Sequence, residues 1–204
     1  MKILFVLKFL IVFGAICAFS VLEIKAGALR SSSVKEIKSC IAQKEANFCE
    51  TPSLASNANE MSVKEFDTQI AGLDGLIGCV NRGLKIPNLS WRIRRDWLIK
   101  RFEYYQMRQI FAQFSCYAKN VGRIEKLTAA TEKEVANKDK KAALRDADLL
   151  QYAALRAKSC IDRGIGFKHI DEEFKEGFRA IAATTGTLIE KVEALRSVVK
   201  QMPE

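Results

Sequence analysis

Apolar residues recur at helical spacing along most of the chain. Between residues 63 and 80 they step by three and four, which places them on one stripe of a helix: Val63, Phe66, Ile70, Leu73, Ile77 and Val80. Ser62 with Glu65 three residues later is a capping-box pattern, so the helix is expected to begin there. Gly83 is expected to end it, and Ser90 is a suitable N-cap for the next helix.

Three further helical segments follow in the C-terminal half. A helix that begins at Trp91 runs to a polar corner at residues 137–140, and it keeps one apolar face on Met107, Ile110, Phe114 and Val121. The next stripe is built mostly from small residues: Ala143, Ala147, Leu150, Ala154, Ala157 and Ile161. After a glycine break at residues 164–166, the last helix shows the seven-residue repeat typical of bundles: Phe174, Phe178, Ile181, Thr185, Leu188, Val192, Leu195 and Val199.

The remaining apolar pattern is a shorter segment that begins at Val34 and carries two cysteines. A loosely polar loop at residues 52–60 follows it. No stretch shows the sustained alternation of strands, and three prolines are too few for an all-β sandwich with its many turns. The sequence therefore predicts an all-α fold, in which a short N-terminal helical unit stapled by cysteine leads into four longer helices.

The first 28 residues have the pattern of a signal peptide. Lys2 and Lys8 supply positive charge, residues 9–22 are all apolar or small, and Ala26-Gly27-Ala28 matches the small-x-small cleavage pattern. An uncleaved membrane anchor is the alternative, but a span needs about 20 apolar residues. We therefore expect a protein secreted to the extracellular space, with residues 29–204 forming a single helical-bundle domain.

Charge and composition narrow the classes of function. The chain has 33 basic and 24 acidic residues, and removing Lys2, Lys8, Lys25 and Glu23 leaves 30 and 23, a net charge of +7. Such a charge favours acidic partners weakly and in a salt-dependent way. An apolar fraction of 49% excludes a disordered or collagen-like chain, and a single His excludes a His-rich metal site. We expect no metal and no cofactor.

Catalytic patterns are absent from the sequence. It contains no nucleophile elbow, no zinc-protease motif and no phosphate-binding loop. His169 could act as a base for Cys79, but a lone His at the start of a helix is more often a cap or a surface residue. The carboxylates Asp171, Glu172 and Glu173 suit the dipole of a first helical turn. The protein is therefore not expected to be an enzyme.

The most unusual local composition lies in residues 91–102, where five basic residues interleave with three aromatic ones. Exposed, this segment would suit a polyanion site, a membrane-surface helix or a protein-binding hot spot made of Trp91, Arg94, Arg95, Trp97 and Arg101. The favoured interpretation is a buried helix whose Arg and Lys stems reach water, because both tryptophans fall in a run that suits a core. Nucleic acid is not expected as a partner of a secreted protein.

Two smaller patterns have structural and functional interpretations. Asn88-Leu89-Ser90 is a glycosylation sequon, and Asn88 is a possible acceptor in a secreted eukaryotic chain. Gly72, Gly75 and Gly78 recur every third residue, which would let a helix or a ligand approach closely; a loosely packed or kinked helix is the alternative.

Five cysteines remain after the signal peptide: Cys40, Cys49, Cys79, Cys116 and Cys160. In an oxidising compartment most of them should pair, and because the number is odd at least one is left over, either buried or bridging to another chain. No two cysteines are separated by only two residues, so zinc-ribbon and thioredoxin-type motifs are excluded.

The spacing of these cysteines resembles that of the plant invertase and pectin methylesterase inhibitor family. Cys40 and Cys49 enclose eight residues, and Ile37 stands three before the first cysteine, as in the N-terminal hairpin of that family. Ala153-Ala154-Leu155 followed by Ser159-Cys160-Ile161-Asp162 is similar to a second signature of the family. The sequence departs from the pattern between the first two cysteines and lacks the Pro-Lys-Phe docking motif.

The resemblance implies a helical hairpin followed by an up-and-down four-helix bundle. It implies disulfides Cys40–Cys49 and Cys116–Cys160, and it leaves Cys79 free. If disulfide mapping of the mature protein found Cys79 paired with any of the other four cysteines, the resemblance would be discarded. The function it implies is stoichiometric binding of another secreted protein, possibly a carbohydrate-active enzyme of the cell wall in the plant apoplast, by an enzyme inhibitor in which no residue does chemistry.

Two alternatives stay open. A secreted carrier would hold an apolar ligand among Trp97, Phe102, Met107, Phe111 and Phe114. An effector or surface-binding protein of an animal or microbe would use residues 91–101 on a polyanion. The oligomeric state is not predicted.

Overall fold

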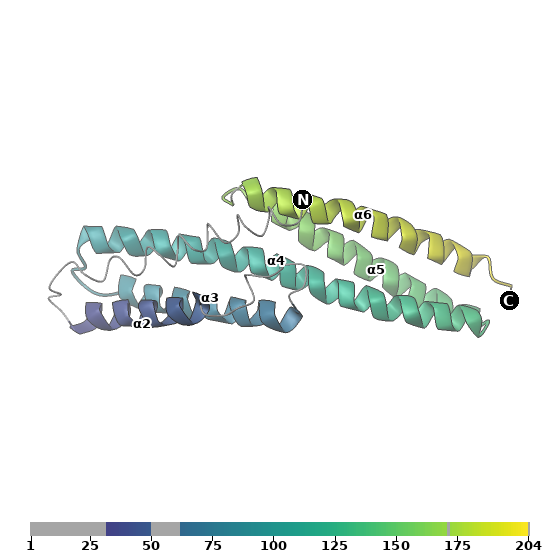
Figure 1. Cartoon of the computed structure of the whole chain (residues 1–204), viewed down its shortest axis with the longest axis horizontal. Coiled ribbons are helices and arrows are strands. Elements are labelled where there is room, and N and C mark those ends of the chain that lie inside the picture. The colour runs from purple at the N-terminus through teal and green to yellow at the C-terminus, as the bar shows by residue number, and fades with distance from the viewer. Residues whose placement is uncertain (1–31, 50–61, 171, 204) are drawn as a thin grey trace. The chain divides into compact units, whose positions relative to one another are not determined.

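The computed structural model describes residues 32–49, 62–170 and 172–203, and the signal peptide predicted at residues 1–28 lies outside them (Figure 1). The helices are α2 (Ser32–Cys49), α3 (Val63–Leu84), α4 (Trp91–Ala136), α5 (Lys140–Ile165) and α6 (Glu172–Lys200). The described residues contain no strand. The predicted all-α fold, with one short N-terminal helix before four longer ones, is confirmed. No helix in these ranges is long and apolar enough to span a membrane.

The helices form two compact units, whose boundary lies within α4 between Phe111 and Ala112. The first unit contains α2, α3 and the first part of α4, and the second contains the rest of α4 with α5 and α6. The assignment of residues 29–204 to a single domain stays a prediction.

In the first unit, α2 and α3 pack as an antiparallel hairpin. Their contacts run in opposite directions along the two helices, with Ile37 near Gly83, Cys40 bonded to Cys79, and Phe48 near Gly72. A Cβ added at Gly72 would lie 3.2 Å from the ring of Phe48, and one at Gly75 would lie 3.0 Å from Lys44 Nζ. Gly72 and Gly75 therefore let α2 approach α3 closely, which was one of the two interpretations of the glycine spacing.

The capping box predicted for α3 is present. The Glu65 amide donates to Ser62 Oγ at 3.3 Å, and the Ser62 amide donates to Glu65 Oε2 at 2.6 Å. Four residues of the predicted stripe are buried in the core of the first unit: Phe66, Leu73, Ile77 and Val80. The ring of Phe66 lies 6.3 Å from that of Phe111 on α4, measured between centroids. The pattern of the sequence thus identified the core-facing side of α3.

The disulfide of the first unit differs from the one that the family resemblance implied. Cys40 is bonded to Cys79, with 6.1 Å between their Cα atoms, so the prediction of Cys40–Cys49 with a free Cys79 is wrong. The reason is geometric: α2 is one continuous helix through Cys49, and nine residues of helix span about 13 Å. Disulfides join Cα atoms about 4–7 Å apart. The antiparallel α3 brings Cys79 within that range.

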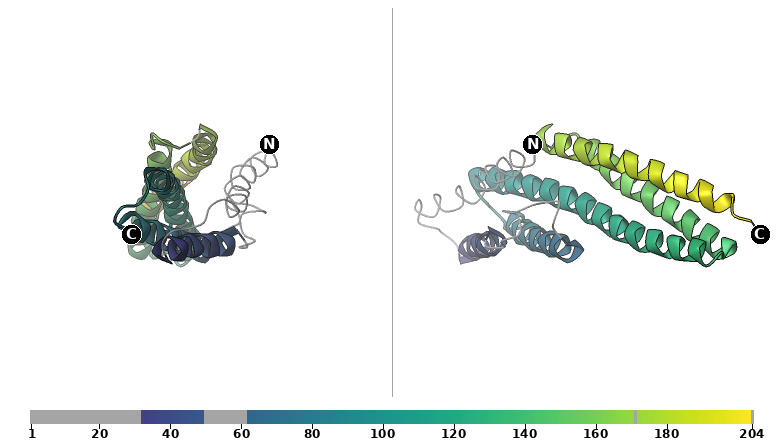
Figure 2. Two further views of the ribbon diagram at one scale, coloured as in Figure 1. Left: turned by 90° about the vertical axis from the view of Figure 1, so that its left-hand side faces the viewer. Right: turned by 45° about the vertical axis from the view of Figure 1, so that its right-hand side comes forward.

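The second unit is held by a disulfide and by small residues on α5. Cys116 on α4 is bonded to Cys160 on α5, as the resemblance implied, with Cα atoms 5.9 Å apart. Figures 1 and 2 show α5 and α6 side by side. The buried core residues come from all three helices: Ile124, Leu150, Ala153, Ala154, Ala157 and Val192. The ring of Phe178 on α6 stacks on Phe114 at a centroid distance of 4.6 Å.

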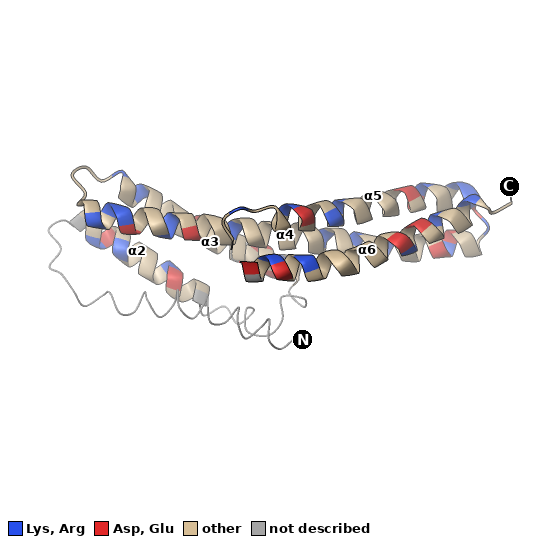
Figure 3. Ribbon diagram, turned by 90° about the horizontal axis from the view of Figure 1, so that it is seen from above, with Lys and Arg blue, Asp and Glu red and all other residues tan. Residues whose placement is uncertain are grey.

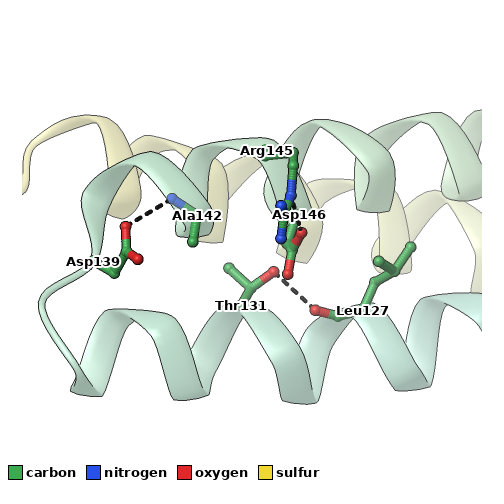
Figure 4. Close-up of polar contacts among 6 residues, drawn as sticks. All are labelled: Leu127, Thr131, Asp139, Ala142, Arg145 and Asp146. Carbon is green, nitrogen blue, oxygen red and sulfur yellow. Dashed lines mark hydrogen bonds and ion pairs between the residues drawn. The ribbon is translucent and has the colours of Figure 1, made fainter.

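The corner between α4 and α5 falls at the predicted residues 137–140. Lys138 adopts a positive φ of 60°, and Asp139 caps α5 by accepting a 2.9 Å hydrogen bond from the Ala142 amide. Figure 4 shows this cap beside two buried polar side chains, Thr131 and Asp146. The Thr131 hydroxyl donates to the Leu127 carbonyl at 2.8 Å, and Arg145 pairs with Asp146 at 2.9 Å. Buried polar groups keep partners here, as burial requires.

Peptide mapping without reduction should find two linked peptide pairs. We expect Cys40 joined to Cys79 and Cys116 joined to Cys160 in the purified protein, because these are the cysteines that the packed helices bring within reach. Mass spectrometry of a non-reduced digest measures this directly. A peptide linking Cys40 to Cys49 would contradict the structure.

Gly83→Ala should destabilise the first unit. A Cβ at Gly83 would lie 2.3 Å from Trp97 Cζ3 and 2.8 Å from Ile37 Cγ2, so the variant overpacks the junction of three helices. We expect its free energy of unfolding to fall by about 1–3 kcal/mol in urea denaturation followed by circular dichroism. Gly78→Ala on the same helix is the matched control. Its Cβ would meet nothing within 4 Å, so it should stabilise by about 0.5–1 kcal/mol.

Candidate functional site

The first turns of α4 start at an exposed bend. Asn88 has a positive φ of 54°, which Asn tolerates better than most residues, and its side chain is exposed. Ser90 then caps the helix, since its hydroxyl accepts from the Ile93 amide at 3.4 Å and its carbonyl from the Arg94 amide at 2.9 Å. The sequon at Asn88 is therefore accessible, and its glycosylation stays a prediction.

One side of this part of α4 is deeply buried. Trp97, Tyr104 and Phe111 stand seven residues apart, and each is less than 5% exposed. Trp97 reaches across to Gly83 on α3, where the missing side chain leaves room for its ring. Trp97 therefore belongs to the core of the first unit and cannot contribute to a surface patch.

The opposite side carries large apolar side chains in water. Trp91 is 72% exposed, so the favoured interpretation that placed both tryptophans in the core is wrong for this one. Ile99 is also exposed. We call the line formed by the following residues, all of them exposed, the α4 outer face: Trp91, Arg95, Leu98, Phe102 and Tyr105. They are separated by four, three, four and three residues.

The arginines of this segment divide into two groups. Arg101 donates to Asn81 Oδ1 at 3.4 Å, and Arg108 binds Asp74 with two hydrogen bonds of 2.5 and 3.2 Å. These arginines join α4 to α3, and the hydrogen bonds to Asp74 raise the pKa of Arg108. Arg101 of the predicted patch is therefore held against α3.

The second group of arginines is available to a partner. Arg92 and Arg95 are exposed, Arg94 is half-buried, and the side chains of these three arginines form no hydrogen bond or ion pair with another described residue. Figure 3 shows basic and acidic residues interspersed along α2 and α6. No acidic residue occupies the first turn of α4, so positive charge dominates there.

A buried ionic contact fixes α4 against α2. Glu45 is only 5% exposed and accepts hydrogen bonds from Lys100 Nζ at 2.8 Å and from the Tyr104 hydroxyl. Burial, with the nearby Glu45 carboxylate, raises the pKa of Tyr104, so its phenol stays protonated and donates. The Glu45 carboxylate can be buried because the Lys100 ammonium and the Tyr104 hydroxyl both donate hydrogen bonds to it. The contact holds the inner side of α4 in place and so orients the outer face.

Cys79 and Glu172, two residues that were considered for a catalytic role, form structural bonds. Cys79 is fully buried and bonded to Cys40, so it is not a free thiol for His169 to activate. Glu172 pairs with Lys175 at 3.3 Å and with Arg179 at 2.6 Å. Asp171 and the side chain of Glu173 lie outside the described residues. Within the described ranges, no three His, Cys, Asp or Glu side chains gather as metal ligands would.

The residues proposed for an apolar ligand differ in their burial and belong to both units. Trp97, Met107 and Phe111 are packed in the core of the first unit, whereas Phe102 is 50% exposed. Phe114 belongs to the second unit, where it stacks on Phe178. Among the described residues, one surface hollow of about 590 Å³ lies on α2 and another of about 510 Å³ lies at the end of α5, and most side chains around them are polar.

Sequence reasoning missed part of the α4 outer face. Leu98 and Tyr105 were not among the predicted patch residues, although continuing the step of four and three from Trp91 leads to both. A second exposed apolar group on α5 was also missed: Leu149, Tyr152 and Leu155. No protein-family model matches the chain, and comparisons with curated proteins and with solved structures found no match.

Glu103→Gln should make the protein more stable at neutral pH. Burial raises the pKa of Glu103. The positive charge of Lys100 lowers this pKa and the negative charge of Glu45 raises it, but burial is the largest contribution. A raised folded-state pKa means that stability falls as the pH rises through it, so the charged Glu103 costs stability at pH 7. We expect a higher Tm for the variant at pH 7, with the difference vanishing below about pH 4.

Glu65→Gln is the control of opposite sign. Hydrogen bonds from the Ser62 backbone and side chain lower the pKa of Glu65, so the carboxylate contributes stability above its unfolded pKa and loses it as the pH falls. This variant should have a lower Tm at pH 7 and a shrinking difference in acid. Shifts of the same sign for both variants would contradict the assigned environments.

Proposed function

We propose that this protein acts by binding another protein stoichiometrically through the α4 outer face, without carrying out a reaction. The observation that carries the proposal is the exposure of Trp91, Leu98, Phe102 and Tyr105 along one line of a helix. Such a group of large apolar side chains on a surface is typical of an interaction site. Tryptophan, tyrosine and arginine are also the residues that dominate binding energy at interfaces.

The support beneath the outer face suits a binding role. Trp97 packs on Gly83, and Glu45 holds Lys100 and Tyr104, so the helix that presents the exposed side chains is anchored at several points. A preformed surface loses less conformational entropy when it binds. The outer face can therefore bind without first having to order its own backbone.

We place this binding outside the cell. Two disulfides are compatible with an oxidising compartment, where bridges form and persist. The leader pattern over residues 1–28 supports the same location. The partner would then be another secreted or surface protein.

A more specific form of the proposal is an inhibitor of pectin methylesterase or invertase. The Cys116–Cys160 bridge and the order of the helices favour it, whereas the Cys40–Cys79 bridge is unlike the pairing that the resemblance implies. Titration of purified pectin methylesterase and acid invertase with the mature protein, between acid and neutral pH, tests this form. Activity that falls to a stoichiometric end point would support it, and unchanged activity throughout would reject it.

The general proposal predicts a crosslink from α4 and none from α5. The photoreactive residue p-benzoyl-phenylalanine would replace Phe102 in one variant and Tyr152 in the other, two aromatic residues of similar exposure, 50% and 56%. After irradiation in the medium of the producing organism, we expect one protein adduct from position 102 only. Mass spectrometry identifies the adduct, and sedimentation of the purified pair should then show a 1:1 complex.

The same binding should depend on the apolar side chains themselves. Trp91→Ala and Leu98→Ala should each weaken the purified complex by about tenfold or more, as truncation at an interface anchor does. Both residues are exposed, so the circular dichroism spectrum should be unchanged. Equal adducts from positions 102 and 152, or no saturable adduct at position 102, would reject the proposal.

A further inference from the structure

The α4 outer face combines an apolar line with unpaired positive charge, and this combination restricts the partner. We infer that the segment it binds is an acidic amphipathic α-helix, which packs lengthwise along Trp91, Leu98 and Phe102 and places carboxylates against Arg92 and Arg95. The inference rests on the proposed function and names the chemistry of the partner.

The shape of the outer face matches a helix. Its members are separated by four, three, four and three residues, which is the spacing of one side of a coiled-coil seam. From Trp91 to Tyr105 the line is about 21 Å long at 1.5 Å per residue. At 100° per residue its members fall within about 80° of arc, so the surface is long and narrow. A second helix presents a seam of the same length and width.

Two arginines, Arg95 on the outer face and Arg92 beside it, favour acidic groups on the partner. Arg92 and Arg95 are exposed, with no ion pair to any other described residue. On α4 itself, Asp96 stands four residues after Arg92, about 40° round the helix, although the two side chains form no ion pair. Asp96 and Glu103 stand about 80–100° round the helix from Arg95. Carboxylates placed beside the first turn of α4 would also be favoured by its helix dipole.

A membrane surface fits the outer face less well. A helix that lies in a bilayer interface has a broad apolar side, with its basic residues on the polar side. Here the four apolar members of the outer face span only about 60° of arc, and Arg95 stands about 20° beyond Phe102 at one edge, so the apolar side is narrow for an interfacial helix. A protein carboxylate can pair with Arg95 at that position.

A second copy of the chain also fits less well. Parallel pairing of two outer faces would put Arg95 opposite Arg95, and antiparallel pairing would put Arg95 against Phe102. The outer face has no carboxylate of its own, so either arrangement leaves its arginines without a counter-charge. Pairing with an acidic helix satisfies the apolar line and the arginines together.

Two synthetic peptides test the inference. Both would be helices of about three heptads with the same leucine seam, one carrying Glu and the other Lys at the flanking positions. Binding to the mature chain, residues 29–204, would be measured by fluorescence anisotropy of the labelled peptide. We expect the Glu peptide to bind at least about tenfold more tightly than the Lys peptide, with the difference shrinking at high salt.

Charge reversal gives the decisive comparison. The double variant Arg92→Glu/Arg95→Glu should prefer the Lys peptide, whereas Arg156→Glu on α5, also an exposed arginine, should behave as the wild type. Equal binding of both peptides, or an unchanged preference in the double variant, would overturn the inference. So would binding to phosphatidylserine vesicles, or self-association, that Phe102→Ala abolishes.

The outcomes separate this inference from the proposed function. A partner that crosslinks at position 102 and binds the double variant as tightly as the wild type overturns the acidic helix and leaves the binding function in place. If no adduct forms at position 102, the proposed function fails and the inference fails with it.

Discussion

The close contact between Trp97 and Gly83 decides which way α4 faces in the first unit. Because Gly83 has no side chain, the indole ring packs directly against α3, at a point that Ile37 of α2 also reaches. Tyr104 and Phe111 follow on the same side of α4, one and two heptads further along. Once this side is buried, the helix must turn Trp91, Leu98 and Phe102 outward. The candidate binding surface is thus a consequence of how the core packs.

Hydrogen bonding then divides the basic residues of this part of α4 into those paired with other helices and those without a partner among the described residues. Arg101 and Arg108 meet Asn81 and Asp74, which are also seven residues apart, so one row of arginines is matched to one row of acceptors on α3. Lys100 is matched to the buried Glu45 of α2. The arginines at positions 92 and 95 have no such acceptor among the described residues, and the inferred acidic partner depends on their charge.

Among the described residues, each unit contains one disulfide, and each of these two bridges joins neighbouring helices rather than positions on one helix. Bridges that close loops of about 40 residues contribute roughly 4 kcal/mol in the chain-entropy model. Cys40 and Cys49 have the spacing of a known hairpin, yet the continuous α2 keeps them a helix length apart. The number of residues between two cysteines gives the distance between them only when the local structure is known. For this reason the resemblance implied one bridge correctly and the other incorrectly.

The sequence by itself determined the helices of this protein. Stripes of apolar residues, the Ser62–Glu65 capping box and the polar corner at residues 137–140 depend on neighbours within a few positions, so local pattern was enough to place them. Only the tertiary structure decided which of two tryptophans is buried, which cysteine meets Cys40 and which arginines are paired. Those outcomes depend on groups that lie 14 to 39 residues away in the chain, such as Gly83 for Trp97 and Cys79 for Cys40, and packing alone brings them together.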